Sequence, residues 1–194
     1  MQKHLFLTGP TGVGKSTLLR EVLGDRLAMA GGFLTRQVRD RDGMLAGCEL
    51  LPAAGAAGVE GLDAQRFLSF PGGSPAADTE VFRRYGVQLL REAAYYPFAL
   101  LDEFGSFELI IPQFRQALEE LLNAPLPVVG ALRTLEEAEL FRQYLGLGER
   151  LTLQCRRLHE ALESDPDTLV IEMRAPGDET ARRALERWAE RYLS

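Results

Sequence analysis

The sequence predicts an α/β fold in which helices cover both faces of a mainly parallel central sheet. Short apolar runs alternate with amphipathic segments along the chain, and these runs are continuously apolar, as in strands buried on both sides. A glycine-rich turn joins the first apolar run to the first amphipathic segment. The length of 194 residues, 46% of them hydrophobic, suits a single domain over residues 1–194.

The elements of the first half follow from apolar runs and the turns that bound them. Residues 3–8 predict a buried strand ended by a Gly-Pro pair, and residues 15–23 predict a helix with an apolar inner side. Residues 31–39 and 44–51 flank the turn sequence DRDG and therefore predict a hairpin. Residues 65–70 predict another short strand between loops of small residues.

The elements of the second half alternate between helix and strand. Asp78 is the expected N-cap of the segment that follows it. Residues 97–102, PFALLD, predict an apolar strand closed by two acidic residues, Asp102 and Glu103. The other expected elements are helices 87–94, 111–122 and 135–144, strands 125–132 and 168–174, and a closing helix 178–193 that Trp188 packs onto the sheet.

Composition and charge narrow the classes of function. A net charge of −6 argues against a surface that coats nucleic acid. No apolar run approaches the length of about 18 residues that a membrane span needs. Cys48 and Cys155 are too few for a disulfide framework or a CxxC metal site. We therefore expect a cytoplasmic protein with no membrane or nucleic-acid partner, and we expect it to act as a monomer.

A phosphate-binding loop is the strongest motif in the sequence. Residues 9–16, GPTGVGKS, match GxxxxGK[ST] between a predicted strand and a predicted helix, as the motif requires. Backbone N–H groups of such a loop surround an anion at the positive end of a helix, whereas a plain glycine-rich turn would not. We expect Lys15 to neutralise phosphate oxygens and Ser16 to bind Mg²⁺. The expected nucleotide-binding residues are Gly9, Pro10, Thr11, Gly12, Val13, Gly14, Lys15, Ser16 and Thr17.

An acidic pair at the end of the second strongly apolar strand could complete this site. In FALLDEFG, Asp102 would hold Mg²⁺ directly or through water, and Glu103 would align or deprotonate the attacking water. The alternative is a solvated or helix-capping acidic pair. The apolar run before the pair and its distance from the phosphate loop both favour the active role.

Four segments together resemble a known family. The phosphate loop, GGFLTRQVR, LLDEFGSFEL and PVVGALR resemble, in order and spacing, the small P-loop nucleoside-triphosphatases of the thermophilic or cancer-related type, over residues 4 to about 133. The resemblance implies a RecA-like, three-layer P-loop fold that slowly hydrolyses ATP, GTP and other nucleoside triphosphates with Mg²⁺. It also implies that Lys15, Ser16 and Asp102 bind phosphate and metal, that Glu103 is catalytic, and that Thr35 and Arg36 lie near the phosphates.

One position departs from the family pattern. Ala131-Leu132-Arg133 stands where family members often carry Thr-x-His. Arg133 could stabilise charge in the transition state, as an arginine finger does, or it could be a surface residue. Residues 151–167 are longer than the family predicts, and the sequence suggests no role for them.

Two other functions fit the phosphate loop. A nucleoside or nucleotide kinase would use residues 33–77 to bind an acceptor, but no arginine-rich lid flanked by glycines follows. A nucleotide-binding module without turnover would not need the acidic pair. No [NT]KxD sequence reads guanine, so we expect a permissive base pocket. Tyr85 or Phe82 is a candidate stacking ring, although the default for either ring is a position in the core.

Overall fold

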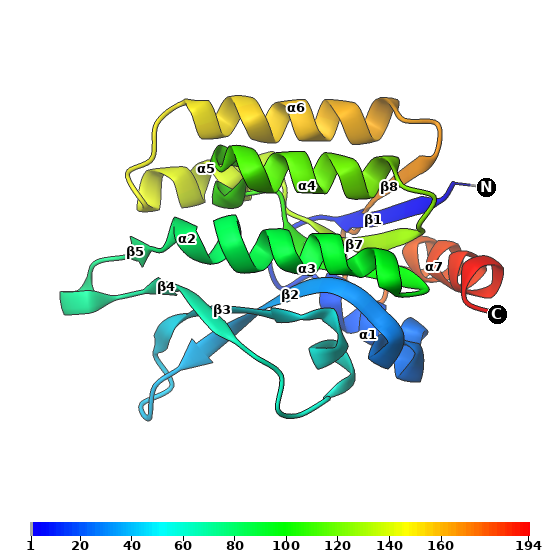
Figure 1. Ribbon diagram of the computed structural model, residues 1–194, viewed down its shortest axis with the longest axis horizontal. Helices are drawn as coiled ribbons and strands as arrows, with labels where there is room; N and C mark the ends of the chain where they lie inside the picture. Colours follow the sequence, from blue (N-terminus) through cyan, green and yellow to red (C-terminus); the bar gives the residue numbers. More distant parts are fainter. Residues whose placement is uncertain (1) are drawn as a thin grey trace.

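The computed structural model describes residues 2–194 and arranges its strands in one eight-stranded sheet, in the order β5-β4-β3-β2-β6-β7-β1-β8 (Figure 1). The parallel part of the sheet consists of β1 (His4–Thr8), β2 (Ala30–Arg39), β6 (Phe98–Phe104), β7 (Val128–Leu132) and β8 (Thr168–Glu172). The strands β3 (Leu45–Pro52), β4 (Gln65–Ser69) and β5 (Ala76–Ala77) extend it in antiparallel fashion beyond β2. The prediction of a mainly parallel sheet is confirmed.

Helices cover both faces of this sheet. The helices α1 (Lys15–Leu23) and α7 (Glu179–Tyr192) lie on one face. The other face carries α2 (Thr79–Val81), α3 (Val87–Glu92), α4 (Pro112–Asn123), α5 (Leu135–Tyr144) and α6 (Arg150–Ser164). Alternate strand residues supply the two cores: Leu5 and Leu7 pack with the first pair of helices, whereas Phe6 packs with the second group. This division makes the three-layer α/β sandwich that the sequence predicts.

Several boundaries differ from those predicted, for identifiable reasons. β6 continues past Asp102 to Phe104, because Phe104 pairs with Leu132 of β7 after a shift in register. The segment before α3, Phe82–Gly86, is a π-helix. It buries the side chains of Phe82 and Tyr85, which are 2% and 6% exposed. Neither ring is available to stack on a nucleotide base, so that expectation is wrong. Trp188 does pack α7 onto the sheet, edge-on against Phe98 of β6.

The strand order determines which chain ends meet at the functional edge. β7 lies between β1 and β6, so the residues after β7 emerge between the loop that follows β1 and the acidic end of β6. In open α/β sheets, ligands bind at the carboxyl ends of the strands where the order of the strands reverses. Over residues 2–194, no helix combines the length and the apolar character needed to cross a bilayer.

Candidate functional site

The phosphate loop has the conformation that its glycines predict. β1 ends at Thr8, and α1 begins at Lys15. Gly9, Gly12 and Gly14 have φ angles of +131°, +82° and +96°, in a region that side chains disfavour. At Gly9, a Cβ atom would lie 2.3 Å from the carbonyl oxygen of Met173, the residue directly after β8. A larger residue at this position would therefore push the loop away from the end of β8. The loop is therefore fixed by backbone geometry.

The first turn of α1 is open to an anion. Gly14 is the N-cap residue, no side chain caps the turn, and no acidic residue lies in it. By contrast, the side chains of Thr134 and Asp178 cap α5 and α7. Uncapped N–H groups at the positive end of a helix dipole attract phosphate. The start of α1 therefore presents uncapped N–H groups, as a phosphate site requires, and the side chain of Thr17 is exposed beside them.

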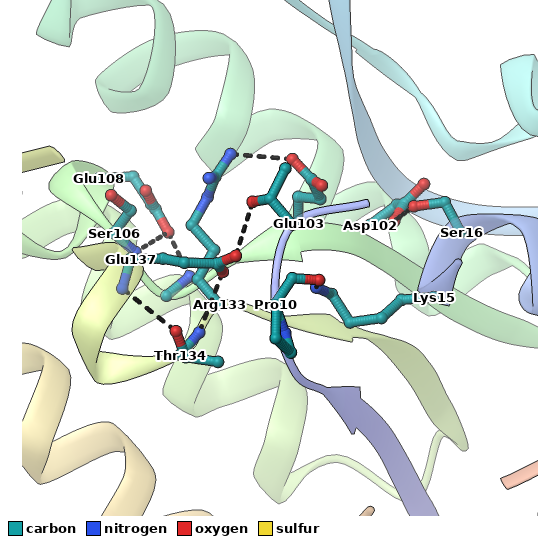
Figure 2. Close-up of polar contacts among 12 residues, drawn as sticks. Pro10, Lys15, Ser16, Asp102, Glu103, Ser106, Glu108, Arg133, Thr134 and Glu137 are labelled. Carbon is teal, nitrogen blue, oxygen red and sulfur yellow. Dashed lines mark hydrogen bonds and ion pairs between the residues drawn. The ribbon is translucent and has the colours of Figure 1, made fainter. Parts of the chain in front are cut away.

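Lys15 places its charge inside this loop. The residue is 5% exposed, and its Nζ atom donates hydrogen bonds to the carbonyl oxygens of Gly9 at 2.5 Å and Pro10 at 3.2 Å. Figure 2 shows the side chain extending back toward Pro10 rather than into solvent. An ammonium group has three donors, so these two bonds leave one for a phosphate oxygen.

The acidic end of β6 meets the phosphate loop through Asp102. The hydroxyl of Ser16 donates a hydrogen bond of 2.7 Å to Oδ1 of Asp102, across 86 residues of sequence, and the two side chains adjoin in Figure 2. Asp102 is 3% exposed, and its burial raises the pKa to about 6, although the Ser16 bond acts in the opposite direction. Arg20 of α1 is its nearest cationic partner, at 4.0 Å.

The oxygen atoms of Ser16 and Asp102 fit a magnesium ion. Mg²⁺ prefers hard oxygen ligands and usually takes one or two from the protein, with the rest from water and phosphate. No group of three or more His, Cys, Asp or Glu residues suited to a metal occurs within residues 2–194, which agrees with such a sparse set of protein ligands. A divalent ion would also offset the cost of burying the Asp102 carboxylate.

Glu103 and Arg133 form an ion pair beside this site. Nη2 of Arg133 lies 2.9 Å from Oε2 of Glu103, and the side chains are 20% and 30% exposed, respectively. The Arg133 guanidinium also lies 5.6 Å from the centre of the Phe141 ring. Because β7 lies between β1 and β6, Arg133 emerges between the phosphate loop and Glu103 (Figure 2). Arg133 is therefore paired with Glu103 beside the phosphate loop, and its part in catalysis stays a prediction.

The backbone at Glu103 is strained. Glu103 has a φ of +61° and is the one non-glycine residue with a positive φ between residues 2 and 194. It lies where the pairing of β6 with β7 shifts register between Asp102 and Phe104. Such a bulge redirects a side chain, and strained residues of this kind cluster at functional sites.

Glu137 and His159 join the site although none of the site motifs contains them, whereas Glu108 belongs to the segment LLDEFGSFEL that carries the resemblance. The carboxylate of Glu137 accepts a hydrogen bond of 2.6 Å from the hydroxyl of Thr11 in the phosphate loop. Glu137 also completes a capping box with Thr134, and the sequence TLEE carries the signature of that box. The ring of His159 hydrogen-bonds the carbonyl oxygen of Arg133 at 2.9 Å. The buried Glu108 follows Glu103 by five residues.

Two residues that the resemblance placed near the phosphates lie on a neighbouring strand. Thr35 and Arg36 follow the point at which Leu34 of β2 pairs with Asp102 of β6. Arg36 forms an ion pair with Glu49 of β3 at 2.8 Å, and Arg66 of β4 binds the same carboxylate at 3.2 Å. This pairing lowers the pKa of Glu49 and holds the antiparallel strands together.

Sequence comparison relates this chain to known nucleoside-triphosphatases. The sequence model of the NTPase family matches residues 4–157, so the similarity continues past Arg133 into α6. The mouse (Mus musculus) cancer-related nucleoside-triphosphatase homolog is 32% identical over 145 residues, 68% of this chain and 76% of that protein. Nucleoside-triphosphatase THEP1 from Thermotoga sp. strain RQ2 is 30% identical over 132 residues, 66% of this chain and 73% of that protein.

A solved structure shows the same fold. The crystal structure of THEP1 from the hyperthermophile Aquifex aeolicus aligns with a TM-score of 0.61 and 22% identity, covering 98% of this chain and 99% of that one. The structural likeness supports a P-loop fold over almost the whole chain, including α6 and α7. The family model's match over residues 4–157, most of the chain, shows that this chain belongs to the NTPase family.

Proposed function

We propose that this protein hydrolyses nucleoside 5′-triphosphates, including ATP and GTP, to the diphosphate and phosphate in a slow, Mg²⁺-dependent reaction. The Ser16–Asp102 hydrogen bond of 2.7 Å carries the proposal, because it joins the phosphate loop to the acidic strand end. The family membership and the names of the relatives support the same reaction class.

In this proposal each residue has a separate task. The N–H groups of residues 9–17 and the ammonium of Lys15 bind the phosphates, and Ser16 and Asp102 would hold Mg²⁺. When bound, Mg²⁺ neutralises charge on the phosphate oxygens. Glu103 orients a water molecule and accepts its proton, and Arg133 stabilises the negative charge that develops on the transferred group.

The ion pair between Glu103 and Arg133 supports a slow rate. The guanidinium of Arg133 donates a hydrogen bond of 2.9 Å to the carboxylate of Glu103, the same group that we propose to act on water. A bound phosphate group that attracts Arg133 would release Glu103. The ion pair between Arg133 and Glu103 has to break before the reaction begins, and this step slows the reaction. The lack of a guanine-reading [NT]KxD sequence supports broad base specificity.

We further propose a cytoplasmic monomer whose residues 1–194 form one domain and do not bind nucleic acid. One sheet passes through every strand of the described chain, which supports one domain. The net charge of −6 opposes contact with a polyanion. Cys48 and Cys155 are both free thiols, which is typical of a reducing compartment.

The deciding experiment measures phosphate release from ATP, GTP, CTP and UTP with Mg²⁺, without Mg²⁺, and with nucleoside monophosphates as acceptors. We expect Mg²⁺-dependent release without any acceptor. We expect Glu103→Gln to lower release by about 100-fold or more while nucleotide binding is retained, because the amide cannot accept the proton. The exposed Glu186→Gln of α7 is the matched control and should leave the rate unchanged.

The same assay contains the outcomes that would replace this function. Diphosphate formed only when a nucleoside or nucleoside monophosphate is present would indicate a kinase. Tight binding without turnover on any nucleotide would indicate a binding module. Turnover by Glu103→Gln at nearly the wild-type rate would assign the activation of water to another group.

A further inference from the structure

Glu108 is a buried carboxylate that the proposed chemistry does not use. It lies in the 3-10 turn Phe107–Ile110, and it is 3% exposed. Its Oε1 atom accepts hydrogen bonds from the backbone N–H groups of Gly105 at 2.6 Å and Ser106 at 2.9 Å. Burial raises the pKa of this carboxyl group, and the two N–H groups oppose the shift. A buried carboxylate is costly unless it is hydrogen-bonded, and these two bonds to backbone N–H groups offset that cost.

The backbone that Glu108 binds is the turn that carries Glu103. Glu103 and Gly105 both have left-handed φ angles, +61° and +98°, at the end of β6. The two N–H groups that donate to the Glu108 carboxylate belong to Gly105 and Ser106, the second and third residues after Glu103. The turn is also held by Arg133, whose backbone N–H donates a hydrogen bond of 2.8 Å to the carbonyl oxygen of Phe104. A non-glycine residue keeps such a conformation only where surrounding contacts hold it.

We infer that Glu108 is a positioning residue for hydrolysis: its carboxylate fixes the turn after Glu103 and thereby aims the Glu103 side chain at the site between Arg133 and the phosphate loop. The inference rests on the proposed function of Glu103. Figure 2 shows Glu108 beside Ser106 and apart from Lys15 and Ser16 of the phosphate loop, and its carboxylate binds the backbone of the turn. Its contribution is to the geometry of Glu103, and small errors in such geometry cost large factors in rate.

The same turn contains a matched control. The hydroxyl of Ser106 is as buried as Glu108, because the residue is 2% exposed, but it has no hydrogen-bond partner within residues 2–194. Ser106→Ala removes a buried polar atom from this turn without removing a contact to the backbone. It should therefore leave the rate unchanged, whereas loss of the Glu108 carboxylate should not.

The test compares steady-state kinetics of the wild type, Glu108→Ala, Glu108→Gln and Ser106→Ala with ATP and Mg²⁺. We expect Glu108→Ala to lower kcat about tenfold or more, because two buried N–H groups lose their acceptor and the turn relaxes. Glu108→Gln keeps an acceptor oxygen and should recover part of the rate. KM and the Mg²⁺ requirement should stay within about twofold, since neither the loop nor Asp102 touches Glu108. Thermal unfolding identifies the variants that fold, and Glu108→Gln replaces Glu108→Ala if the latter does not.

A double-mutant cycle separates positioning from general support of the fold. In a Glu103→Gln background, the Glu108 substitution should cause no further fall in the single-turnover release of γ-labelled phosphate, because there is no catalytic carboxylate left to position. An equal fall in both backgrounds, a change mainly in KM, or a wild-type kcat in Glu108→Ala would overturn the inference. If the wild type itself releases no phosphate, the proposed function fails instead, and the inference with it.

Discussion

The phosphate loop and the acidic end of β6 meet at the Ser16–Asp102 bond, yet they are built by different means. In the loop, each positive φ belongs to a glycine, and the conformation follows from the backbone alone. At the end of β6, a glutamate takes a positive φ, and side chains from other elements hold it there. The first region is relaxed, whereas the second is strained.

This difference separates binding from turnover. We expect a relaxed loop with a buried ammonium and uncapped N–H groups to bind phosphate without rearrangement. The acidic end holds Glu103 in an ion pair, which has to open in the proposed mechanism before the carboxylate acts on water. Substitutions in the loop should therefore change affinity, and substitutions at the acidic end should change rate or stability. Three experiments test this division.

The largest effect is expected in the loop. Lys15→Ala should weaken binding of a non-hydrolysable ATP analogue by about 100-fold or more, because the phosphates lose a charge-assisted hydrogen bond inside a desolvated loop. Isothermal titration calorimetry measures the affinity. Lys3→Ala removes the other lysine of the chain, whose Nζ binds the carbonyl oxygen of Ala124, and should leave the affinity unchanged. An unaltered affinity in Lys15→Ala would refute the phosphate site.

An intermediate effect is expected at Arg133. Arg133→Ala should lower kcat about tenfold and leave KM nearly unchanged, because it removes a cation that we propose to act on the transition state. Arg142→Ala, which breaks the ion pair between Arg142 and Glu139 within α5, is the control and should retain the rate. A loss confined to affinity would place Arg133 with the binding loop. A higher kcat would show that the ion pair restrains Glu103 more than Arg133 assists the reaction.

The same division explains how much of the molecule the sequence predicts. The helices at residues 15–23 and 135–144 are predicted to the residue, since local signals mark the start of both: Gly14 precedes the first, and the Thr134–Glu137 capping box begins the second. The phosphate loop is predicted for the same reason. Its motif, strand and helix are consecutive in the chain.

What the sequence does not predict depends on contacts between distant segments. β6 passes its expected end at Asp102 because Phe104 pairs with Leu132, and this pairing depends on β7 lying beside β6. The same strand order brings Arg133 to Glu103, and the turn at Gly105 brings back the Glu108 carboxylate. No local pattern encodes the order of parallel strands. The sequence therefore predicts that Asp102 and Glu103 are candidate catalytic acids. It does not predict the backbone strain at Glu103 or the contacts that Arg133 and Glu108 make there.

The smallest effect tests the strain itself. Both Glu103→Gly and Glu103→Ala lose the ion pair with Arg133, but only glycine accepts a φ of +61° without strain. We expect Glu103→Gly to be more stable than Glu103→Ala by about 1 kcal/mol, as measured by urea unfolding. The matched pair at exposed Glu119, inside α4, should give the opposite sign, because glycine destabilises a helix by about 1 kcal/mol relative to alanine. If alanine were the more stable residue at both positions, Glu103 would bear no backbone strain, and the acidic end would differ from the phosphate loop only in its ion pair.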